Sequence, residues 1–465
     1  MSRLHEMLFI INVCMAQLLA LGGLAQTVAP MFIIGDTFGV MDEGEISWYT
    51  AAFSLAVGTF ILPAGRIGDI YGHKRVFMCG WAWYAVFSVI TGFSYTASLG
   101  KGSIMLSVTR GFQGLGPAVT VPNAMALIGT TFPPGMKKSV VFSLFGSCGP
   151  TGFVLGALIS SVIAQLGWWP WCFWALAITS VFIFAASYFI IPADRPKSET
   201  TKFDFVGAAS GVSGLILINF SWNQAPVVGW EQQYVPFTLG IGILLLAFFA
   251  YYELHAAKHP LVPMRGFQKE ALLALACIAV GWSSHGIWLY YFFTFAMKFR
   301  HASAISAASQ ISPVAILGPI CALSTGFLMK KMRVAYIMLL AMICFLLGTI
   351  FLTIAPVDQP YLILTFWSVL VMPGGMNWSF PAGSILLSSA MPKEHQGMAA
   401  SLVSTTVNYS ISMGLGIAGT ANKYVGQQHG PLAGLRAGYY LAIGQCCVGV
   451  VLASYFVWRS RVAQQ

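Results

Sequence analysis

Arg110 is the only lysine or arginine that we place within an apolar span of this 465-residue chain, so it is the first candidate for chemistry. An arginine inside a bilayer costs at least ~2.5–3.5 kcal/mol unless it faces water or a polar partner, and such residues commonly serve ion or proton movement. In the alternative interpretation, Arg110 lies near the outer interface and only extends its guanidinium to the headgroups.

Proton coupling would also need a group that titrates along the path. We expect no Asp or Glu deep in a span; the candidates at the edges are Asp36, at the outer end of the first span, Glu45 and Asp69. His285 is the titratable candidate in mid-span, and its side-chain type switches near neutral pH. A neutral imidazole bonded to a neighbouring helix is an equally good interpretation of His285.

Several uncharged polar side chains could line a solute path through the spans. Pro373-Gly374-Gly375 is predicted to break the twelfth span, and discontinuous helices often offer backbone groups to a ligand. A packing kink is the alternative for that segment, and interhelical hydrogen bonding worth under ~2 kcal/mol is the alternative for the polar side chains. The candidate path residues are Gln26, Gln113, Asn123, Asn377, Trp378 and Asn408.

The fifth span is rich in glycine. On a helix, Gly149, Gly152 and Gly156 share one face, and the spacing of the last two is typical of close helix contacts. Pro150 is expected to bend the helix because it removes a backbone donor. With Gly146, these residues form a predicted packing hinge.

Composition identifies the elements that must position these residues. Charged residues make up 8% of the chain and apolar ones 57%, which is typical of an all-α polytopic membrane protein. Apolar runs predict fourteen spans, near 8–34, 47–64, 76–97, 103–131, 139–165, 168–192, 204–222, 235–254, 271–297, 305–329, 335–355, 361–390, 397–420 and 438–458.

The net charge of +10 does not indicate nucleic-acid binding, because Lys and Arg are scattered among loops, most of them on one side of the predicted membrane. That asymmetry places both termini in the cytoplasm. The nine cysteines show no metal-ligand spacing and no CxxC pair, and the first apolar run is too long for a signal peptide. Asn219 begins a glycosylation sequon near an outer helix end, where the membrane would hinder its use.

A weak internal repeat divides the chain. Residues 121–133 align with residues 380–392, with prolines matched at both ends. We therefore predict two six-helix bundles, 1–195 and 271–465, flanking a two-helix insert at 196–270. Residues 192–204 and 255–269 are predicted to be linkers.

The stretch from Gly65 to Arg75 is predicted to be a charged, glycine-rich turn between two spans, with Asp69, Gly72 and Lys74 as further key residues. It resembles the signature between helices 2 and 3 of the major facilitator superfamily. The string that begins at Arg110 resembles the fourth-helix signature of that family, with matches at Arg110, Gln113, Gly114, Gly116 and Ala118.

The resemblance extends over nearly the whole chain to fungal fourteen-span drug:proton antiporters. Residues 47–75 are similar to the aminotriazole-resistance and boron-efflux subgroup, which includes a low-affinity ammonium transporter. Two departures stand out: Gln26 occupies a position where these antiporters usually carry Asp, and only Gly149-Pro150 keeps the register of the fifth-helix antiporter signature.

The resemblance implies a monomeric transporter, not an enzyme, in the fungal plasma membrane. It implies proton-coupled efflux of small toxic compounds or secondary metabolites by alternating access between the two bundles. Arg110 would couple to protonation, and residues 65–75 would act as a conformational latch. The alternative is a facilitator of a small solute such as ammonium or borate, which the missing carboxylate at position 26 favours.

Overall fold

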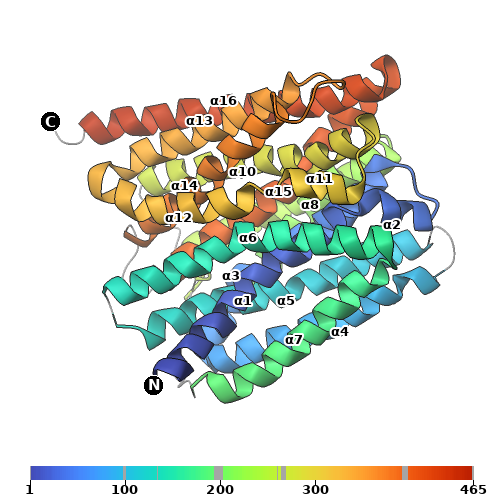
Figure 1. The fold of residues 1–465 in the computed structure, drawn as a ribbon. Coiled ribbons are helices and arrows are strands. Elements are labelled where there is room, and N and C mark those ends of the chain that lie inside the picture. Colours follow the sequence, from blue (N-terminus) through green and yellow to red (C-terminus); the bar gives the residue numbers. More distant parts are fainter. Residues whose placement is uncertain are drawn as a thin grey trace. The chain divides into compact units, whose positions relative to one another are not determined.

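The computed structural model describes residues 2–97, 101–133, 135–192, 203–258, 260–262, 269–389 and 396–462, and within these ranges every regular element is a helix (Figure 1). The elements are α1 (Arg3–Val28), α2 (Met31–Thr37), α3 (Glu43–Tyr71), α4 (His73–Gly92), the 3-10 helix η1 (Phe93–Thr96), α5 (Lys101–Thr131), α6 (Met136–Leu166), α7 (Pro170–Ile190), α8 (Phe205–Val228), α9 (Tyr234–His255), α10 (Lys269–Thr294), the π-helical turn η3 (Phe295–Phe299), α11 (Ala304–Gln310), α12 (Val314–Lys331), α13 (Val334–Thr353), α14 (Thr365–Ser389), α15 (Gln396–His429) and α16 (Pro431–Val462).

Eleven helices in the described ranges are long and apolar enough to cross a bilayer. Every one of the fourteen predicted spans overlaps a helix, but α5, α14 and α15 are not among these eleven. The polar side chains of α5, which include Arg110, Gln113 and Asn123, lower its hydropathy and lie buried against neighbouring helices. The chain is therefore an all-helical, multi-pass membrane protein.

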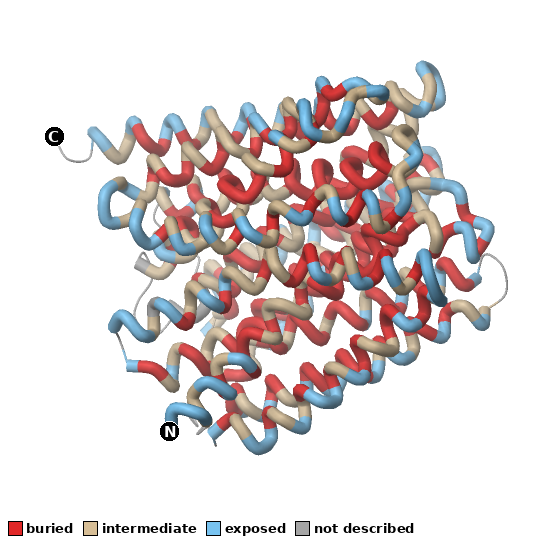
Figure 2. Tube along the Cα trace, viewed as in Figure 1, coloured by how far each residue is buried: buried red, intermediate tan, exposed pale blue. Residues whose placement is uncertain are grey.

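Apolar side chains also cover the outside of the helices. Figure 2 shows buried and exposed positions alternating along most of them. Large apolar side chains at the exposed positions suit contact with lipid tails, since a bilayer imposes no penalty on them. Examples are Phe182 and Phe189 on α7, Leu244 on α9 and Val451 on α16.

The described chain forms two compact units. One comprises Met1–Ile218 and Gly240–Met264, and the other comprises Asn219–Leu239 and Arg265–Gln465. The two boundaries near the middle of the chain fall inside α8 and α9, so each of these helices contributes to both units. Most of the two predicted linkers (193–202, 259 and 263–268) and the repeat residue Pro392 lie outside the described residues.

In the first unit, α1 and α6 pack with their backbones in close approach. A Cβ added to Gly152 would lie 2.1 Å from the Leu18 carbonyl oxygen, and one added to Gly156 would lie 2.4 Å from that of Gly22. Gly146 has nothing within 4 Å of such a Cβ, so it takes no part in this contact. Pro150 lies inside α6, which continues past it to Leu166.

Gly152→Ala is expected to lower the stability of the protein, whereas Gly146→Ala is its matched control in the same helix. The new methyl at 152 meets a backbone carbonyl that cannot rotate away, and overpacking of this kind costs ~1–3 kcal/mol. Thermal unfolding of the detergent-purified variants measures the effect. Equal midpoints for the two variants would contradict the packing described here.

In the second unit, the predicted break in the twelfth span is absent, because α14 runs uninterrupted from Thr365 to Ser389 with Pro373 inside it. The adjacent glycines serve helix packing instead. A Cβ on Gly374 would lie 2.9 Å from Cys344 Sγ, and one on Gly375 would lie 2.6 Å from the Phe345 ring. The two glycines therefore let α13 approach α14 closely.

Candidate functional site

The candidate site is built around Arg110, whose side chain is fully buried on α5. Its guanidinium donates three hydrogen bonds: Nε to the Tyr49 carbonyl oxygen at 3.0 Å, one terminal nitrogen to Gln113 Oε1 at 2.6 Å, and the other to Thr27 Oγ1 at 3.2 Å. These acceptors come from α3, α5 and α1. The buried arginine thus ties three helices of one unit together.

The network continues through its uncharged partners. Gln113 donates from Nε2 to Ser88 Oγ on α4 at 2.7 Å, which fixes its amide so that Oε1 faces Arg110. Thr27 donates from Oγ1 to the Tyr49 carbonyl oxygen at 3.1 Å. We call Arg110, Gln113, Thr27, Tyr49 and Ser88 the Arg110 network; it joins α1, α3, α4 and α5.

Aromatic rings complete the surroundings of the guanidinium. Its central carbon lies 4.3 Å from the Phe53 ring centroid on α3 and 5.9 Å from that of Phe173 on α7, distances at which a ring face attracts a cation. Within the described part of the chain, no carboxylate lies within ion-pairing distance of Arg110. Neutral dipoles and rings alone therefore stabilise a charge whose burial costs several kcal/mol (~2.5 or more).

Gln26 lies next to this network in sequence but has different partners. Its Nε2 donates to the Cys172 carbonyl oxygen on α7 at 2.9 Å, and its buried Oε1 has no hydrogen-bond partner among the described residues. An unsatisfied acceptor here can receive a bond from water or a solute. Asp36 is exposed at the end of α2 and has no contact with Arg110.

The segment from Gly65 to Arg75 differs from the predicted turn. Helix α3 continues through Tyr71, and the chain turns only at Gly72, whose φ of 95° lies in the region that favours glycine. Helix α4 begins at the next residue, His73. The backbone of residues 65–75 is therefore helical except at Gly72. The hydrogen bonds of α3 extend up to this glycine, and those of α4 begin directly after it.

Side chains around Gly72 form a second polar cluster. Asp69 Oδ1 lies 3.5 Å from His73 Nε2, and His73 Nδ1 lies 2.9 Å from Asn123 Oδ1 on α5. Asn123 Nδ2 donates to the Val119 carbonyl oxygen at 2.7 Å. Asn123, predicted to lie on a solute path, is thus placed beside the signature, and we call Asp69, His73 and Asn123 the α3–α4 cluster.

Lys74 and Arg75 follow the cluster on α4. Lys74 Nζ donates to the Tyr188 carbonyl oxygen at 2.9 Å and to that of Ile191, which ties the start of α4 to the end of α7. Arg75 is exposed. The two basic residues therefore have different roles: one connects helices, and the other faces outward.

His285 lies on α10 in the second unit, where aromatic rings surround it. Its ring centroid is 5.6 Å from that of Trp288 and 5.4 Å from that of Trp282, and Phe345 lies at 6.1 Å. The imidazole is buried, and Nδ1 has no hydrogen-bond partner among the described residues. The structure brings His285 and Arg110 to different units, so each is a separate candidate for proton coupling.

The other predicted path residues in the second unit donate hydrogen bonds to nearby atoms of the protein. Asn377 Nδ2 donates to the Pro373 carbonyl oxygen at 3.0 Å, and Trp378 Nε1 donates to Ser324 Oγ on α12 at 3.0 Å. Asn408 is half-buried, and its Nδ2 donates to the carbonyl oxygen of Ser404 on the same helix at 3.0 Å.

Asn219 is not available for glycosylation in this structure. Its side chain is fully buried on α8, and Oδ1 accepts hydrogen bonds from Ser412 Oγ on α15 at 2.8 Å and from Asn223 Nδ2 at 2.9 Å. The sequon therefore contributes a polar contact between α8 and α15, within one unit.

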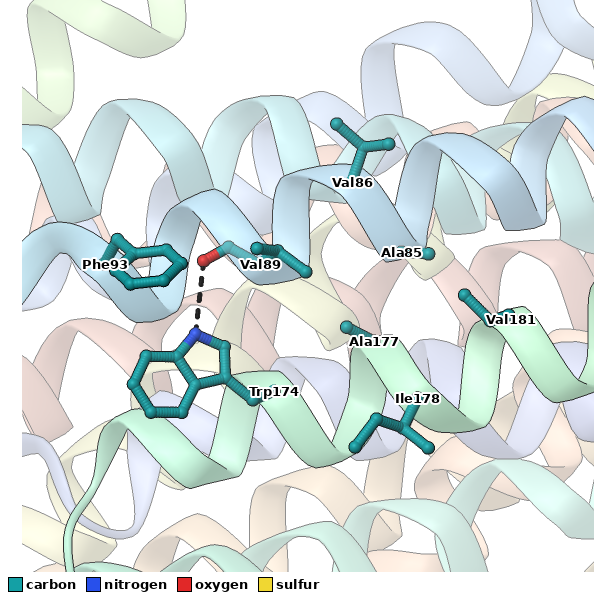
Figure 3. A pocket seen from close by; sticks show the side chains of 8 residues that line it. All are labelled: Ala85, Val86, Val89, Phe93, Trp174, Ala177, Ile178 and Val181. Carbon is teal, nitrogen blue, oxygen red and sulfur yellow. Dashed lines mark hydrogen bonds between the residues drawn. The ribbon is translucent and has the colours of Figure 1, made fainter.

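An open apolar groove of about 570 Å³ lies between α4 and α7 (Figure 3). The one hydrogen bond drawn there joins Trp174 Nε1 to the Val89 carbonyl oxygen at 3.3 Å, so the indole donor is already used. The groove offers no polar group to orient a solute and suits lipid contact. It is lined by Ala85, Val86, Val89, Phe93, Trp174, Ala177, Ile178 and Val181.

Sequence reasoning named Gln113, Asp69 and Asn123 but missed the other members of both polar clusters. Thr27, Tyr49 and Ser88 are ordinary residues in apolar helices, and no local pattern marks them as members of the Arg110 network. His73 had a usable signal, because it lies inside the signature four residues after Asp69 and so shares a helical face with it.

Arg300, which lies between η3 and α11, was also missed. It donates to the carbonyl oxygens of Val357 and Pro356 at 3.0 and 2.8 Å and to Thr365 Oγ1 at 2.9 Å. Partial burial lowers the pKa of its guanidinium. This arginine ties two connecting segments of the second unit together.

Comparison with known proteins gives a consistent result. The family model for the Major Facilitator Superfamily matches residues 11–417. The chain is 46% identical to a low affinity ammonium transporter of Saccharomyces cerevisiae, over 99% of this chain and 90% of that protein. It is 38% identical to an efflux pump of Aspergillus terreus, over 97% and 88%.

Among solved structures, the chain is similar to a POT family transporter, with a TM-score of 0.71 and 14% identity over 100% of this chain and 97% of the other. At that identity the likeness concerns the fold. The sequence-based resemblance to the fungal transporters is confirmed by the two fungal relatives.

Proposed function

Because the chain belongs to the Major Facilitator Superfamily and is a multi-pass membrane transporter rather than an enzyme, we propose that it exports small toxic compounds or secondary metabolites in exchange for protons. The relatives include a protein named as an efflux pump. The transported species would be a small molecule, exposed to each side of the membrane in turn by alternating access.

The observation that carries this proposal is the Arg110 network. No carboxylate among the described residues neutralises the guanidinium. A proton or an anion that arrives nearby therefore changes the strength of the hydrogen bonds by which Arg110 holds α1, α3 and α5 together. Gln26 Oε1, which is buried and has no partner among the described residues, offers an acceptor for a solute or water. Arg110 would thus link solute and proton occupancy.

The α3–α4 cluster supports the proposed latch. Asp69, His73 and Asn123 connect the end of α3, the start of α4 and the C-terminal third of α5 by contacts of 3.5 and 2.9 Å. Such contacts can form in one arrangement of the helices and break in another, which is what a latch requires. Gly65, Gly72, Lys74 and Arg75 would complete it.

The proposal includes the predicted membrane arrangement. Fourteen spans would form two six-helix bundles, 1–195 and 271–465, with the insert 196–270 between them. Both termini would be cytoplasmic, the protein would be a monomer, and the membrane would be the plasma membrane. Most Lys and Arg residues lie in loops on one predicted side of the membrane, and this asymmetry supports cytoplasmic termini.

A second candidate function is facilitated movement of a small solute such as ammonium or borate. One observation favours it: the uncharged Gln26 stands where an antiporter carboxylate is expected. A relative named as a low affinity ammonium transporter adds support.

Proteoliposomes distinguish the two functions. Purified protein is reconstituted, a pH gradient is imposed or withheld, and solute flux and internal pH are followed together for a panel of toxic organic compounds, ammonium and borate. Coupled efflux predicts that flux rises with the gradient and that protons move in the opposite direction. Flux of ammonium or borate that does not depend on the gradient would contradict coupling and select the facilitator.

His285→Phe separates the two proton candidates in the same assay. Phenylalanine preserves the aromatic surroundings of that site but cannot carry a proton. If Arg110 is the coupling centre, this variant keeps the gradient dependence; loss of the dependence would transfer the role to His285.

A further inference from the structure

The parallel helices α1 and α6 keep a constant register over successive turns. Gly152 faces Leu18, and one turn later Gly156 faces Gly22, so both pairs have the same sequence offset. Backbone contact at both turns means that the helix axes stay close along this stretch. The preceding turn on each helix must then continue the same pairing.

Cysteines occupy that preceding turn on both helices. Cys14 lies one turn before Leu18, and Cys148 lies one turn before Gly152, with the same offset again. Because residues four apart share a face of a helix, both cysteines lie on the faces through which α1 and α6 contact each other. Cys14 is buried and Cys148 is half-buried, and both are free thiols in the structure.

We propose that Cys14 and Cys148 form an oxidation site at which a peroxide produces a disulfide between α1 and α6. Disulfides need Cα atoms about 4.4–6.8 Å apart, a spacing that requires helices in close backbone contact, as α1 and α6 are one turn away. This proposal is independent of the proposed transport activity.

The reaction balances with hydrogen peroxide as the oxidant. One thiol attacks the peroxide, the O–O bond breaks, and a sulfenic acid and one water form. The second thiol then attacks the sulfenic sulfur and releases a second water as the S–S bond forms. The two cysteines lose two electrons and two protons in total, which reduce one peroxide to two waters.

The crosslink would act on the helix that also carries Thr27, one of the acceptors of Arg110. Joining α1 to α6 covalently would hold α1 in the position from which Thr27 reaches the guanidinium. The site would therefore make the alignment of α1 sensitive to oxidants.

A cleavable chain tests the proposal. A protease site inserted between Ala97 and Lys101 separates the segment with Cys14 from the segment with Cys148 after folding. The full-length protein is treated with hydrogen peroxide, blocked with a maleimide, cleaved and run on a non-reducing gel. We expect the two fragments to remain joined and to separate on reduction.

Three variants make the result specific. Cys14→Ser and Cys148→Ser are each expected to abolish the link, whereas Cys79→Ser retains it, because Cys79 is an exposed residue of α4 in the same fragment as Cys14. In the protein without the inserted protease site and without any substitution, thiol counting by mass spectrometry checks for the loss of two thiols. Separate fragments and an unchanged thiol count in the oxidised protein, or a link that survives in Cys14→Ser, would overturn the proposal.

Discussion

Replacing Arg110 by alanine is expected to reduce solute transport at least tenfold while the protein still reaches the membrane. The substitution removes three hydrogen bonds at once and leaves Gln113 Oε1 without its donor, while the Tyr49 carbonyl oxygen keeps the Thr27 hydroxyl. Each buried acceptor left unsatisfied costs ~1–3 kcal/mol, and the charge that would respond to a proton is gone. Initial rates in proteoliposomes, normalised to reconstituted protein, measure the effect.

Arg110→Lys refines this expectation. Lysine keeps the charge but replaces a planar fork by a point charge with rotatable donors, so it cannot reach acceptors on α1, α3 and α5 in the same geometry. We expect an intermediate rate and a weaker gradient dependence. A lysine variant with full activity would show that charge alone suffices and that the geometry of the network is unimportant.

Asp36→Asn is the matched control for the proton role. Asp36 was one of the edge candidates in the sequence, but it is exposed at the end of α2 and outside the network. Its neutralisation is expected to leave the rate and gradient dependence within about twofold of the parent, since exposed charges contribute little. Loss of coupling in this variant, with Arg110→Ala unaffected, would reverse the assignment.

The helices could be predicted from the sequence because the apolar runs that specify them are local. Long apolar runs predict helices in a membrane whatever their neighbours are, since only helices satisfy the backbone there without partners. That α6 makes a close helix contact was likewise predictable, because Gly152 and Gly156 lie on one face. The helix that α6 contacts could not be predicted, because it depends on how helices distant in sequence pack together.

The candidate site shows the same limit. Arg110 stands out from the sequence as a charge in an apolar run, but its acceptors Thr27 and Tyr49 lie on helices far away in sequence. The predicted turn at residues 65–75 and the break at Pro373 failed for a different reason. Glycine and proline indicate only which backbone conformations are allowed. Helix packing determines that Gly72 alone turns the chain in this segment and that α14 continues past Pro373.

Gly68→Ala is expected to disrupt the α3–α4 cluster. A Cβ at this position would lie 1.8 Å from Asn123 Oδ1 and 2.6 Å from His73 Nδ1. Asn123 is fully buried, so its side chain can leave only by breaking the contact with His73. Overpacking and loss of that bond together predict a destabilisation of ~2–4 kcal/mol, visible as a lower midpoint of thermal unfolding.

A double-mutant cycle isolates the steric cause from the general effect of changing a helix. Gly129→Ala, in a helix position where a Cβ meets nothing within 4 Å, is expected to be neutral or slightly stabilising because alanine favours helices. Asn123→Ala alone removes the hydrogen bond and lowers stability, but it also removes the atom that the new methyl group at position 68 would strike. The Gly68→Ala and Asn123→Ala changes combined are therefore expected to cost less than the sum of the two separate losses. Strict additivity would mean that Gly68 and Asn123 do not contact each other, and the latch proposed for this cluster would lose its structural basis.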